Sequence, residues 1–223
     1  MRVVLYGASG MIGSGVLLEC LDDAGVSEVL AVGRSPSGRT HPRLQELVLP
    51  DLSDYRAVQP RLLNWDACFF CLGISSAGMK EEAYRRITLN LTLAAARALL
   101  AGSPALTFCF VTGAGTDSSE QGRVMWARIK GMAENALLAM PFKAAYMFRP
   151  GVIQPLRGVR SRTRLYQVLI EIARPVFPLL RRAFPQSVTS SVEIGRAMLN
   201  VTRSGYPKRI LDPGDINFAA AGR

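Results

Sequence analysis

The stretch "VVLYGASGMIGSG" (residues 3–15) decides the fold of this chain. A short apolar run leads into Gly7, Gly10 and Gly13, and apolar residues at helical spacing follow over residues 11–24. The first glycine permits a tight turn, the second lets the backbone approach a diphosphate, and the third lets the helix pack on the strand. The pattern predicts a strand, a dinucleotide-binding turn and a helix. The alternative is that the glycines serve only the turn.

The backbone of this turn is expected to supply the ligands for the phosphates. The first N–H groups of a helix have no acceptor within the helix, and they lie at the positive end of its dipole. The residues expected around the diphosphate are Gly7, Ser9, Gly10, Met11, Ile12 and Gly13.

The end of the second apolar run, residues 28–33, indicates which dinucleotide is bound. A site that prefers NAD usually carries Asp or Glu there, whereas this chain has Arg34 followed by Ser35. A planar guanidinium suits a 2′-phosphate, so we predict that NADP(H) is preferred and that NAD(H) is a second option. Arg39 is a further candidate for the phosphate. Alternatively, Arg34 is merely exposed or stacks on the adenine of either cofactor.

Strand and helix patterns alternate along the rest of the chain. Nearly continuous apolar strands favour a parallel sheet covered on both faces. We therefore predict an α/β fold of the Rossmann type, a doubly wound parallel sheet with a small C-terminal helical lid. Residues 1–155 form the NAD(P)-binding domain in this interpretation, and residues 156–223 form a lid or substrate region packed on the same domain. Strands are expected at 2–6, 28–33, 44–49, 67–73, 106–112, 144–149 and 208–211, and helices at 11–24, 54–64, 81–101, 123–140, 164–184 and 190–203.

Composition narrows the classes of function. The chain has 223 residues, four cysteines and a single histidine, His41, so a His-based triad or a multi-His metal site is excluded by count. Cys68 and Cys71 have Cys-x-x-Cys spacing, but positions three apart in a strand point to opposite faces. We expect them to be buried apolar residues and expect no metal. The N-terminus has no secretory signal and no stretch is long enough to span a membrane, which favours a cytoplasmic location.

Positive charge is concentrated toward the C-terminus. Residues 1–150 carry 15 Lys and Arg against 13 Asp and Glu, whereas residues 151–223 carry 12 against 4. A solvated basic face, nucleic acid, an anionic membrane or a phosphorylated substrate could each account for this. Few aromatic residues lie among the arginines, so specific nucleic-acid binding is not expected. The basic residues are expected to form a solvated face, with contact to an anionic surface or membrane as the alternative. The arginines nearest one another are Arg157, Arg160, Arg162 and Arg164. The oligomeric state is not indicated.

Several short motifs in order give a resemblance to a known family. They are the glycine turn, "GRS" at 33–35, "DL" at 51–52, "CLG" at 71–73, the helix with Lys130, and "FRPG" at 148–151. Together they resemble the atypical short-chain dehydrogenase/reductases, in particular the Tat-interacting-protein-like oxidoreductases, over about residues 1–155.

The resemblance implies a role for each matching position. Asp51 and Leu52 would lie beside the adenine, and Leu72 and Gly73 beside the ribose and phosphates. Thr112 would take the place of the catalytic Ser or Thr. The remaining implied contacts are Lys130 at the nicotinamide ribose, Pro150 and Gly151 at the nicotinamide, and Asn90 on the active-site helix.

One residue departs from the family pattern. Trp126 occupies the position of the catalytic tyrosine, four residues before Lys130. An indole N–H donates a hydrogen bond but does not ionise near neutral pH, so the usual proton donor is missing. Tyr84, Tyr146 and Tyr166 are candidate replacements. The alternative is that the segment is an amphipathic helix with a packing residue and a surface lysine.

Two functions follow from these observations. The first is reduction of a small carbonyl or quinone-like substrate by hydride transfer from NADP(H). In that reaction Thr112 would polarise the substrate oxygen, and Lys130 or a water molecule would supply the proton. The second is a non-catalytic protein that senses NADP(H) and acts in regulation or interaction.

Overall fold

The main sheet is parallel throughout, as predicted. The computed structural model describes residues 1–159, 177, 182 and 186–222. Seven strands are arranged in the order β3-β2-β1-β4-β5-β6-β9. Strands β2 and β3 are added on one side of β1, and the strands from β4 onward are added on its other side. The Rossmann-type fold is therefore confirmed. The strands are β1 Arg2–Tyr6, β2 Glu28–Gly33, β3 Leu44–Val48, β4 Ala67–Phe70, β5 Thr107–Val111, β6 Ala144–Phe148 and β9 Ile210–Leu211.

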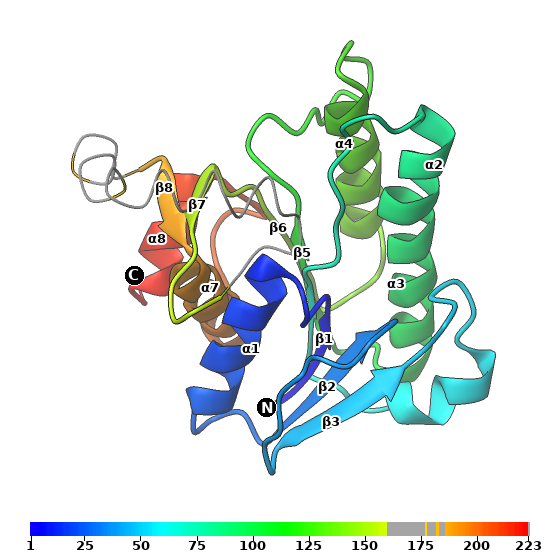
Figure 1. Ribbon diagram of the computed structural model, residues 1–223, viewed down its shortest axis with the longest axis vertical. Helices are drawn as coiled ribbons and strands as arrows, with labels where there is room; N and C mark the ends of the chain where they lie inside the picture. The colour runs from blue at the N-terminus through cyan, green and yellow to red at the C-terminus, as the bar shows by residue number, and fades with distance from the viewer. Residues whose placement is uncertain (160–176, 178–181, 183–185, 223) are drawn as a thin grey trace.

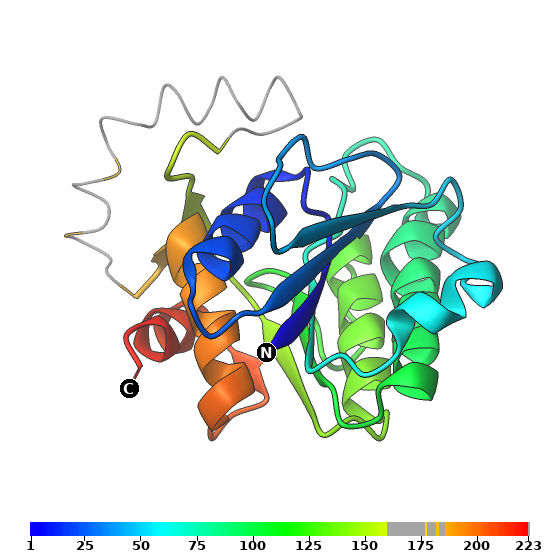
Figure 2. The same ribbon diagram turned by 90° about the horizontal axis from the view of Figure 1, so that it is seen from below.

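Helices cover both faces of this sheet (Figures 1 and 2). Successive strand residues point to opposite faces. Val3 and Leu5 of β1 accordingly join the core beneath α1 and α7, whereas Val4 and Tyr6 join the core beneath α3 and α4. All residues of β4 and β5 are buried, as expected for central parallel strands. The helices are α1 Met11–Asp22, α2 Glu81–Arg85, α3 Leu91–Gly102, α4 Met125–Leu138, α7 Ser191–Ser204 and α8 Pro213–Ala220.

The C-terminal region completes these layers. Helix α7 packs on α1 through small residues, since a Cβ added at Gly15 would lie 2.6 Å from Cβ of Ser191. Glu19 of α1 is 7% exposed, and its carboxylate pairs with Arg157 at 2.8 Å and with Arg196 at 3.0 Å. Strand β9 joins β6 in the main sheet. The described residues after 155 therefore pack on the Rossmann fold through Arg157, α7 and β9, while the division into two regions stays a prediction.

Several local features differ from the predicted elements. The helix expected at 54–64 is a 3₁₀-helix, Arg56–Leu62, which contains Pro60. The helix expected at 81–101 is interrupted by a π-helical stretch, Arg86–Asn90. The sequence analysis missed α8 and a small parallel sheet of β7 (Val152–Gln154) and β8 (Val188–Ser190). The helix expected at 164–184 lies outside the described residues, apart from residues 177 and 182.

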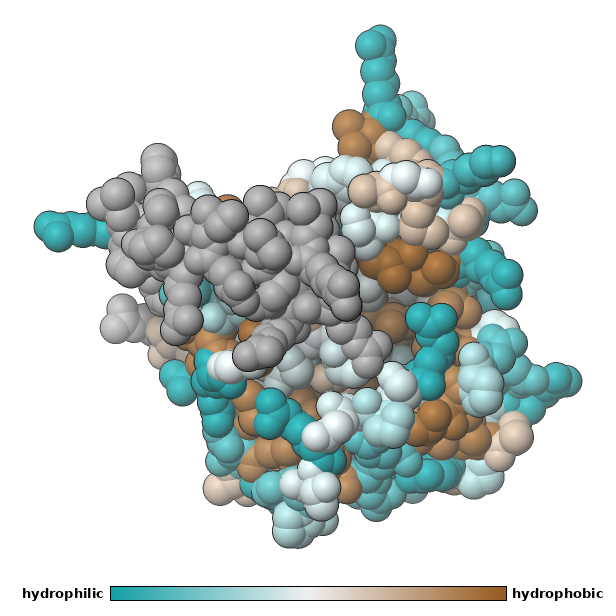
Figure 3. All heavy atoms as spheres, in the orientation of Figure 1, coloured by the Kyte–Doolittle hydropathy of each residue, from teal (hydrophilic) through white to brown (hydrophobic). Residues whose placement is uncertain are grey.

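The surface is mixed in character. In the view of Figure 3, charged side chains project from the rim of the molecule and apolar residues gather between them. Among the described residues, no helix has the length and apolar character needed to cross a membrane.

Candidate dinucleotide and active site

Glycines shape the turn between β1 and α1. Gly7 has φ of 80°, in the left-handed region, and a Cβ there would lie 2.7 Å from the carbonyl oxygen of Cys71 at the end of β4. A Cβ at Gly13 would overlap the carbonyl oxygen of Gly7. Side chains are therefore excluded at both positions, and the backbone of the turn stays open to a ligand.

The first turn of α1 presents free donors. Gly10 is the N-cap residue and its N–H donates to the carbonyl of Gly7 at 2.8 Å, but no side chain caps the helix. The amides of Met11 and Ile12 have no acceptor within the helix, and no acidic residue lies in the first turn. This end of α1 suits a diphosphate.

A shallow pocket joins the turn to the end of β2. Its lining brings together five predicted cofactor residues. Arg34 is exposed at its rim, and among the described residues it has no hydrogen bond or ion pair. Arg39 is also exposed but lies outside this lining. The lining consists of Gly7, Ala8, Ser9, Ala31, Val32, Gly33, Arg34, Ser35, Ser37 and Leu72.

The predicted cofactor residues outside this pocket differ in how exposed they are. Asp51 is exposed, and hydrogen bonds from the hydroxyl of Ser53 and then from its N–H, at 2.8 Å, lower the pKa of its carboxyl. Leu52 is 3% exposed and its side chain belongs to the core, so only its backbone could face an adenine. Gly73 is open, because a Cβ there would have no neighbour within 4 Å.

Thr112 follows β5 directly, but its hydroxyl is already engaged. The side chain is buried, and Oγ1 lies 2.6 Å from Oε1 of Glu134 and 3.1 Å from the carbonyl oxygen of Phe148. The role expected for Thr112, polarisation of a substrate oxygen, does not fit this geometry. A position at a strand end does not fix which way the hydroxyl points, and here it points to the carboxylate.

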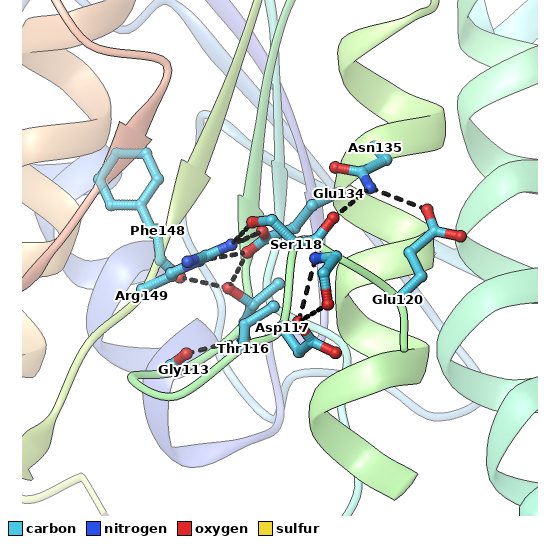
Figure 4. Close-up of polar contacts among 11 residues, drawn as sticks. Gly113, Thr116, Asp117, Ser118, Glu120, Glu134, Asn135, Phe148 and Arg149 are labelled. Atoms are coloured by element: carbon cyan, nitrogen blue, oxygen red, sulfur yellow. Dashed lines mark hydrogen bonds and ion pairs between the residues drawn. The ribbon is translucent and has the colours of Figure 1, made fainter. Parts of the chain in front are cut away.

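The carboxylate that binds Thr112 belongs to a buried ion pair of Glu134 and Arg149 (Figure 4). Glu134 is fully buried on α4, and Arg149 follows β6. Nη2 of Arg149 is 2.5 Å from Oε2 of Glu134 and 2.5 Å from Oγ of Ser118. The hydrogen bond to Glu134, together with other nearby carboxylates, raises the pKa of Arg149. The pair therefore joins a helix, a strand end and the loop before α4.

Lys130 reaches the same strand end from α4. Its Nζ donates to the backbone carbonyl of Thr112 at 2.5 Å. Burial lowers the pKa of Lys130 to about 8, and the nearby carboxylate of Glu134 opposes this shift. An ammonium group with this pKa can hold or release a proton near neutral pH.

Trp126 lies one helical turn before Lys130 and is half-buried. Tyr84 is buried in the core, and the hydroxyl of Tyr146 accepts a hydrogen bond from the N–H of Tyr206. Neither replaces the missing tyrosine, and Tyr166 lies outside the described residues.

Two of the three remaining positions taken from the family, Asn90 and Pro150, also differ in surroundings. Asn90 is exposed at the end of the π-helical stretch. Pro150 is buried, and its carbonyl accepts a hydrogen bond from the N–H of Ala114 at 2.9 Å. Pro150 thus fixes the loop that follows β5.

That loop, residues 113–122, is held firmly on α4. Asp117 accepts hydrogen bonds from the N–H groups of Ser119 and Gly122 at 3.0 and 2.7 Å. A Cβ at Gly131 of α4 would overlap the carbonyl oxygen of Asp117. The Asn135 amide donates to the carbonyl of Ser118 at 2.9 Å (Figure 4).

Sequence reasoning missed Glu134 and Arg149 as site residues. Glu134 lies four residues after Lys130, so the two side chains share a helix face. This spacing is the feature of the sequence that could have indicated Glu134 as a site residue. Arg149 lies within the "FRPG" motif, but its partner could be known only from the packing of α4 against β6.

Comparison with known proteins places the chain among named relatives. No family model matches it. It is 30% identical over 169 residues to "Protein fmp52-1, mitochondrial" of Aspergillus terreus, a match that covers 73% of this chain and 69% of that protein. The chain belongs to the FMP52 family. A second member, "Protein FMP52, mitochondrial" of Eremothecium gossypii, is 26% identical over 155 residues, 69% of this chain and 66% of that protein.

The expected cytoplasmic location is contradicted by these two FMP52 relatives, both of which are named as mitochondrial proteins. The expectation rested on the lack of a secretory signal. That observation does not test import into mitochondria.

Solved structures with the same fold include a complex with NAD+, an epimerase and a short-chain dehydrogenase family protein. Bordetella bronchiseptica WbmF, solved in complex with NAD+, has a TM-score of 0.68 at 13% identity, with 97% of this chain and 76% of that chain covered. The UDP-N-acetylglucosamine 4-epimerase of Methanobrevibacter ruminantium has a TM-score of 0.70 at 15% identity, with 94% and 75% covered. A short-chain dehydrogenase family protein of Francisella tularensis has a TM-score of 0.62 at 17% identity, with 92% and 91% covered. The resemblance to short-chain dehydrogenase/reductases is thus confirmed for the fold, and the narrower Tat-interacting-protein-like branch stays a prediction.

Proposed function

We propose that this chain binds a nicotinamide dinucleotide at the β1–α1 turn and prefers NADP(H). The observation that carries the proposal is the pocket shared by the glycine turn and Arg34. Gly7, Ser9 and the free amides of α1 would hold the diphosphate, and Arg34 and Ser35 would face the 2′-phosphate. The structures of similar fold solved with NAD support the class of cofactor.

The residues present fit this cofactor. The cradle contains two glycines at which a side chain would collide with backbone, and the pocket lining contains no carboxylate. Free N–H groups and one guanidinium make a donor set for phosphates. A 2′-hydroxyl would instead need an acidic acceptor after β2, and this chain has none there.

We propose further that the bound cofactor serves the reduction of a small carbonyl or quinone-like substrate. When bound, NADPH supplies the hydride. Lys130 is the proton donor in this proposal, because it is the titratable group at the end of β5 with a pKa of about 8. Thr112 positions Lys130 through its backbone carbonyl, while Glu134 holds the side chain of Thr112.

Calorimetric titration with NADPH and NADH tests the binding proposal. We expect NADPH to bind more tightly, and we expect Arg34→Ala to weaken NADPH binding by roughly tenfold while leaving NADH binding nearly unchanged. Arg97→Ala is the control, since Arg97 is an exposed arginine on α3 outside the pocket lining. If neither nucleotide gives heat or shifts thermal unfolding, the proposal fails.

A non-catalytic sensor of NADP(H) is the second candidate. Two observations favour it: Trp126 replaces the tyrosine, and the hydroxyl of Thr112 is bound to Glu134. Turnover of NADPH with a carbonyl panel, abolished by Lys130→Ala, would decide for the reductase. Turnover that appears only in Trp126→Tyr would decide for the sensor.

Contact between the basic C-terminal third and an anionic surface is a further proposal, and one of its clustered arginines is paired within the fold. Arg157, one of the four clustered arginines, is paired with Glu19 and Asp22 at 2.8 and 2.6 Å. Arg160, Arg162 and Arg164 lie outside the described residues. Co-sedimentation with anionic liposomes at low and high salt tests this contact.

A further inference from the structure

Trp126 presents part of an aromatic ring beside Lys130. The two residues are four apart on α4, so their side chains lie on one helix face. The indole is half-buried, and its six-membered ring lies 3.5 Å from where a Cβ at Gly115 would be. Within the described residues, the indole N–H has no hydrogen-bond partner. The exposed part of the ring is therefore available to a ligand.

The backbone around this ring carries few side chains. Gly113 and Gly115 lie on the loop after β5, and a Cβ at Gly113 would meet only Nζ of Lys130, at 4.0 Å. Within this loop, Oγ1 of Thr116 donates to the carbonyl of Gly113 at 2.8 Å. An aromatic ring and bare backbone thus border one ammonium group.

This surface suits a flat ligand better than a sugar. Aromatic rings stack on planar π-systems. A polyol would require several hydrogen-bond acceptors, but the nearby carboxylate, Glu134, is buried and bound by Arg149 and Thr112. Lys130 offers only donors, which match a carbonyl oxygen.

We infer that the substrate is a planar aromatic quinone that stacks on the indole of Trp126 with one oxygen facing Lys130. This inference rests on the proposed function and names its substrate class. Conversion of a quinone to a hydroquinone needs two electrons and two protons. NADPH supplies both electrons and one proton as hydride and becomes NADP+, and Lys130 supplies the second proton. Trp126 is then the residue that determines specificity.

Tryptophan fluorescence reports the stacking without turnover. The chain has two tryptophans, and Trp65 is buried with its Nε1 donating to the carbonyl of Arg61 at 2.8 Å. In Trp65→Phe protein all tryptophan emission therefore comes from Trp126. We expect menadione, added with saturating NADP+, to quench this emission saturably. N-acetyltryptophanamide controls for light absorbed by menadione.

Kinetic comparison tests specificity. We expect Trp126→Ala to raise the Kd and KM for menadione by roughly three- to tenfold, and Trp126→Phe to keep them near wild type. The KM for diacetyl, a non-aromatic dicarbonyl, should change much less in both variants. Equal menadione affinity in wild type and Trp126→Ala, or no saturable quench, would overturn the inference.

The two proposals fail differently in these measurements. NADPH binding without Trp126-dependent menadione binding overturns only the inference about the substrate. Menadione binding that depends on Trp126, without binding of either nicotinamide nucleotide in calorimetry, overturns the proposed function.

Discussion

Glu134 and Arg149 form a buried ion pair, with Nη2 of Arg149 2.5 Å from Oε2 of Glu134. The carboxylate is fully buried, and the guanidinium side chain is 14% exposed. Glu134 also accepts a hydrogen bond from Thr112, whose carbonyl accepts one from Lys130. The pair thus anchors the helix, the strand end and the lysine of the candidate active site to one another.

Removal of Glu134 should therefore be costly. We expect Glu134→Ala to lower the free energy of unfolding by about 3–5 kcal/mol, because it leaves the charge of Arg149 buried and unpaired. Urea denaturation at neutral pH measures this. Arg56→Ala is the control, since Arg56 pairs with Asp54 on the surface and is 92% exposed, and it should unfold close to wild type. Equal losses in the two variants would show that the buried pair contributes little.

The sequence was sufficient for the sheet and the glycine turn but not for the polar network. The apolar run of β5 is continuous, and a side chain at Gly7 or Gly13 would collide with the backbone. Patterns within a few residues are therefore enough to predict the strand and the turn. The partner of Glu134 lies 15 residues away on another element, and only tertiary packing brings it close. β7 and β8 have three residues each, too few for a periodic signal.

The same distinction applies to the residues taken from family resemblance. Nζ of Lys130 lies at the end of β5, and its expected contact with the nicotinamide ribose stays a prediction. Position in the chain could not show that the hydroxyl of Thr112 would be bound by a carboxylate, or that the side chain of Leu52 would enter the core. These outcomes depend on side-chain direction and on neighbours distant in sequence.

Gly131 should be essential for the loop before α4. Because an added Cβ would overlap the carbonyl oxygen of Asp117, we expect Gly131→Ala to cost about 1–3 kcal/mol or more in unfolding free energy. Gly73→Ala is the matched control, since its Cβ would have no neighbour within 4 Å. That variant should keep its stability but bind NADPH more weakly if the cofactor passes this point. Stable Gly131→Ala protein would contradict the overlap.

Glu19 should contribute to the docking of α7 on α1. Glu19→Gln leaves Arg157 and Arg196 with a neutral partner, and we expect a loss of about 1–3 kcal/mol in unfolding free energy. Glu81→Gln is the comparison, because Glu81 pairs with Arg128 while 49% exposed. We expect a clearly smaller loss there. Chemical denaturation of both variants, side by side, distinguishes a buried anchor from an ordinary surface pair.

Lys130 should make stability depend on pH in a specific window. Burial lowers its folded-state pKa to about 8, against about 10.4 in an unfolded chain. Between these values the unfolded chain binds a proton that the folded protein has released, so the contribution of Lys130 to stability rises with pH. Below pH 8 the cost of burying the charged ammonium group is fully present.

Comparison with Lys130→Met isolates this contribution, because other lysines, tyrosines and cysteines titrate in the same range. We expect the Met variant to be more stable than wild type at pH 7.5. By pH 10 wild type should regain about 2–3 kcal/mol relative to the variant, as its buried amine becomes neutral. Urea denaturation of both proteins at the two pH values measures the difference. Stability curves that run parallel across this window would mean that Lys130 keeps an ordinary pKa and is not the proton donor proposed above.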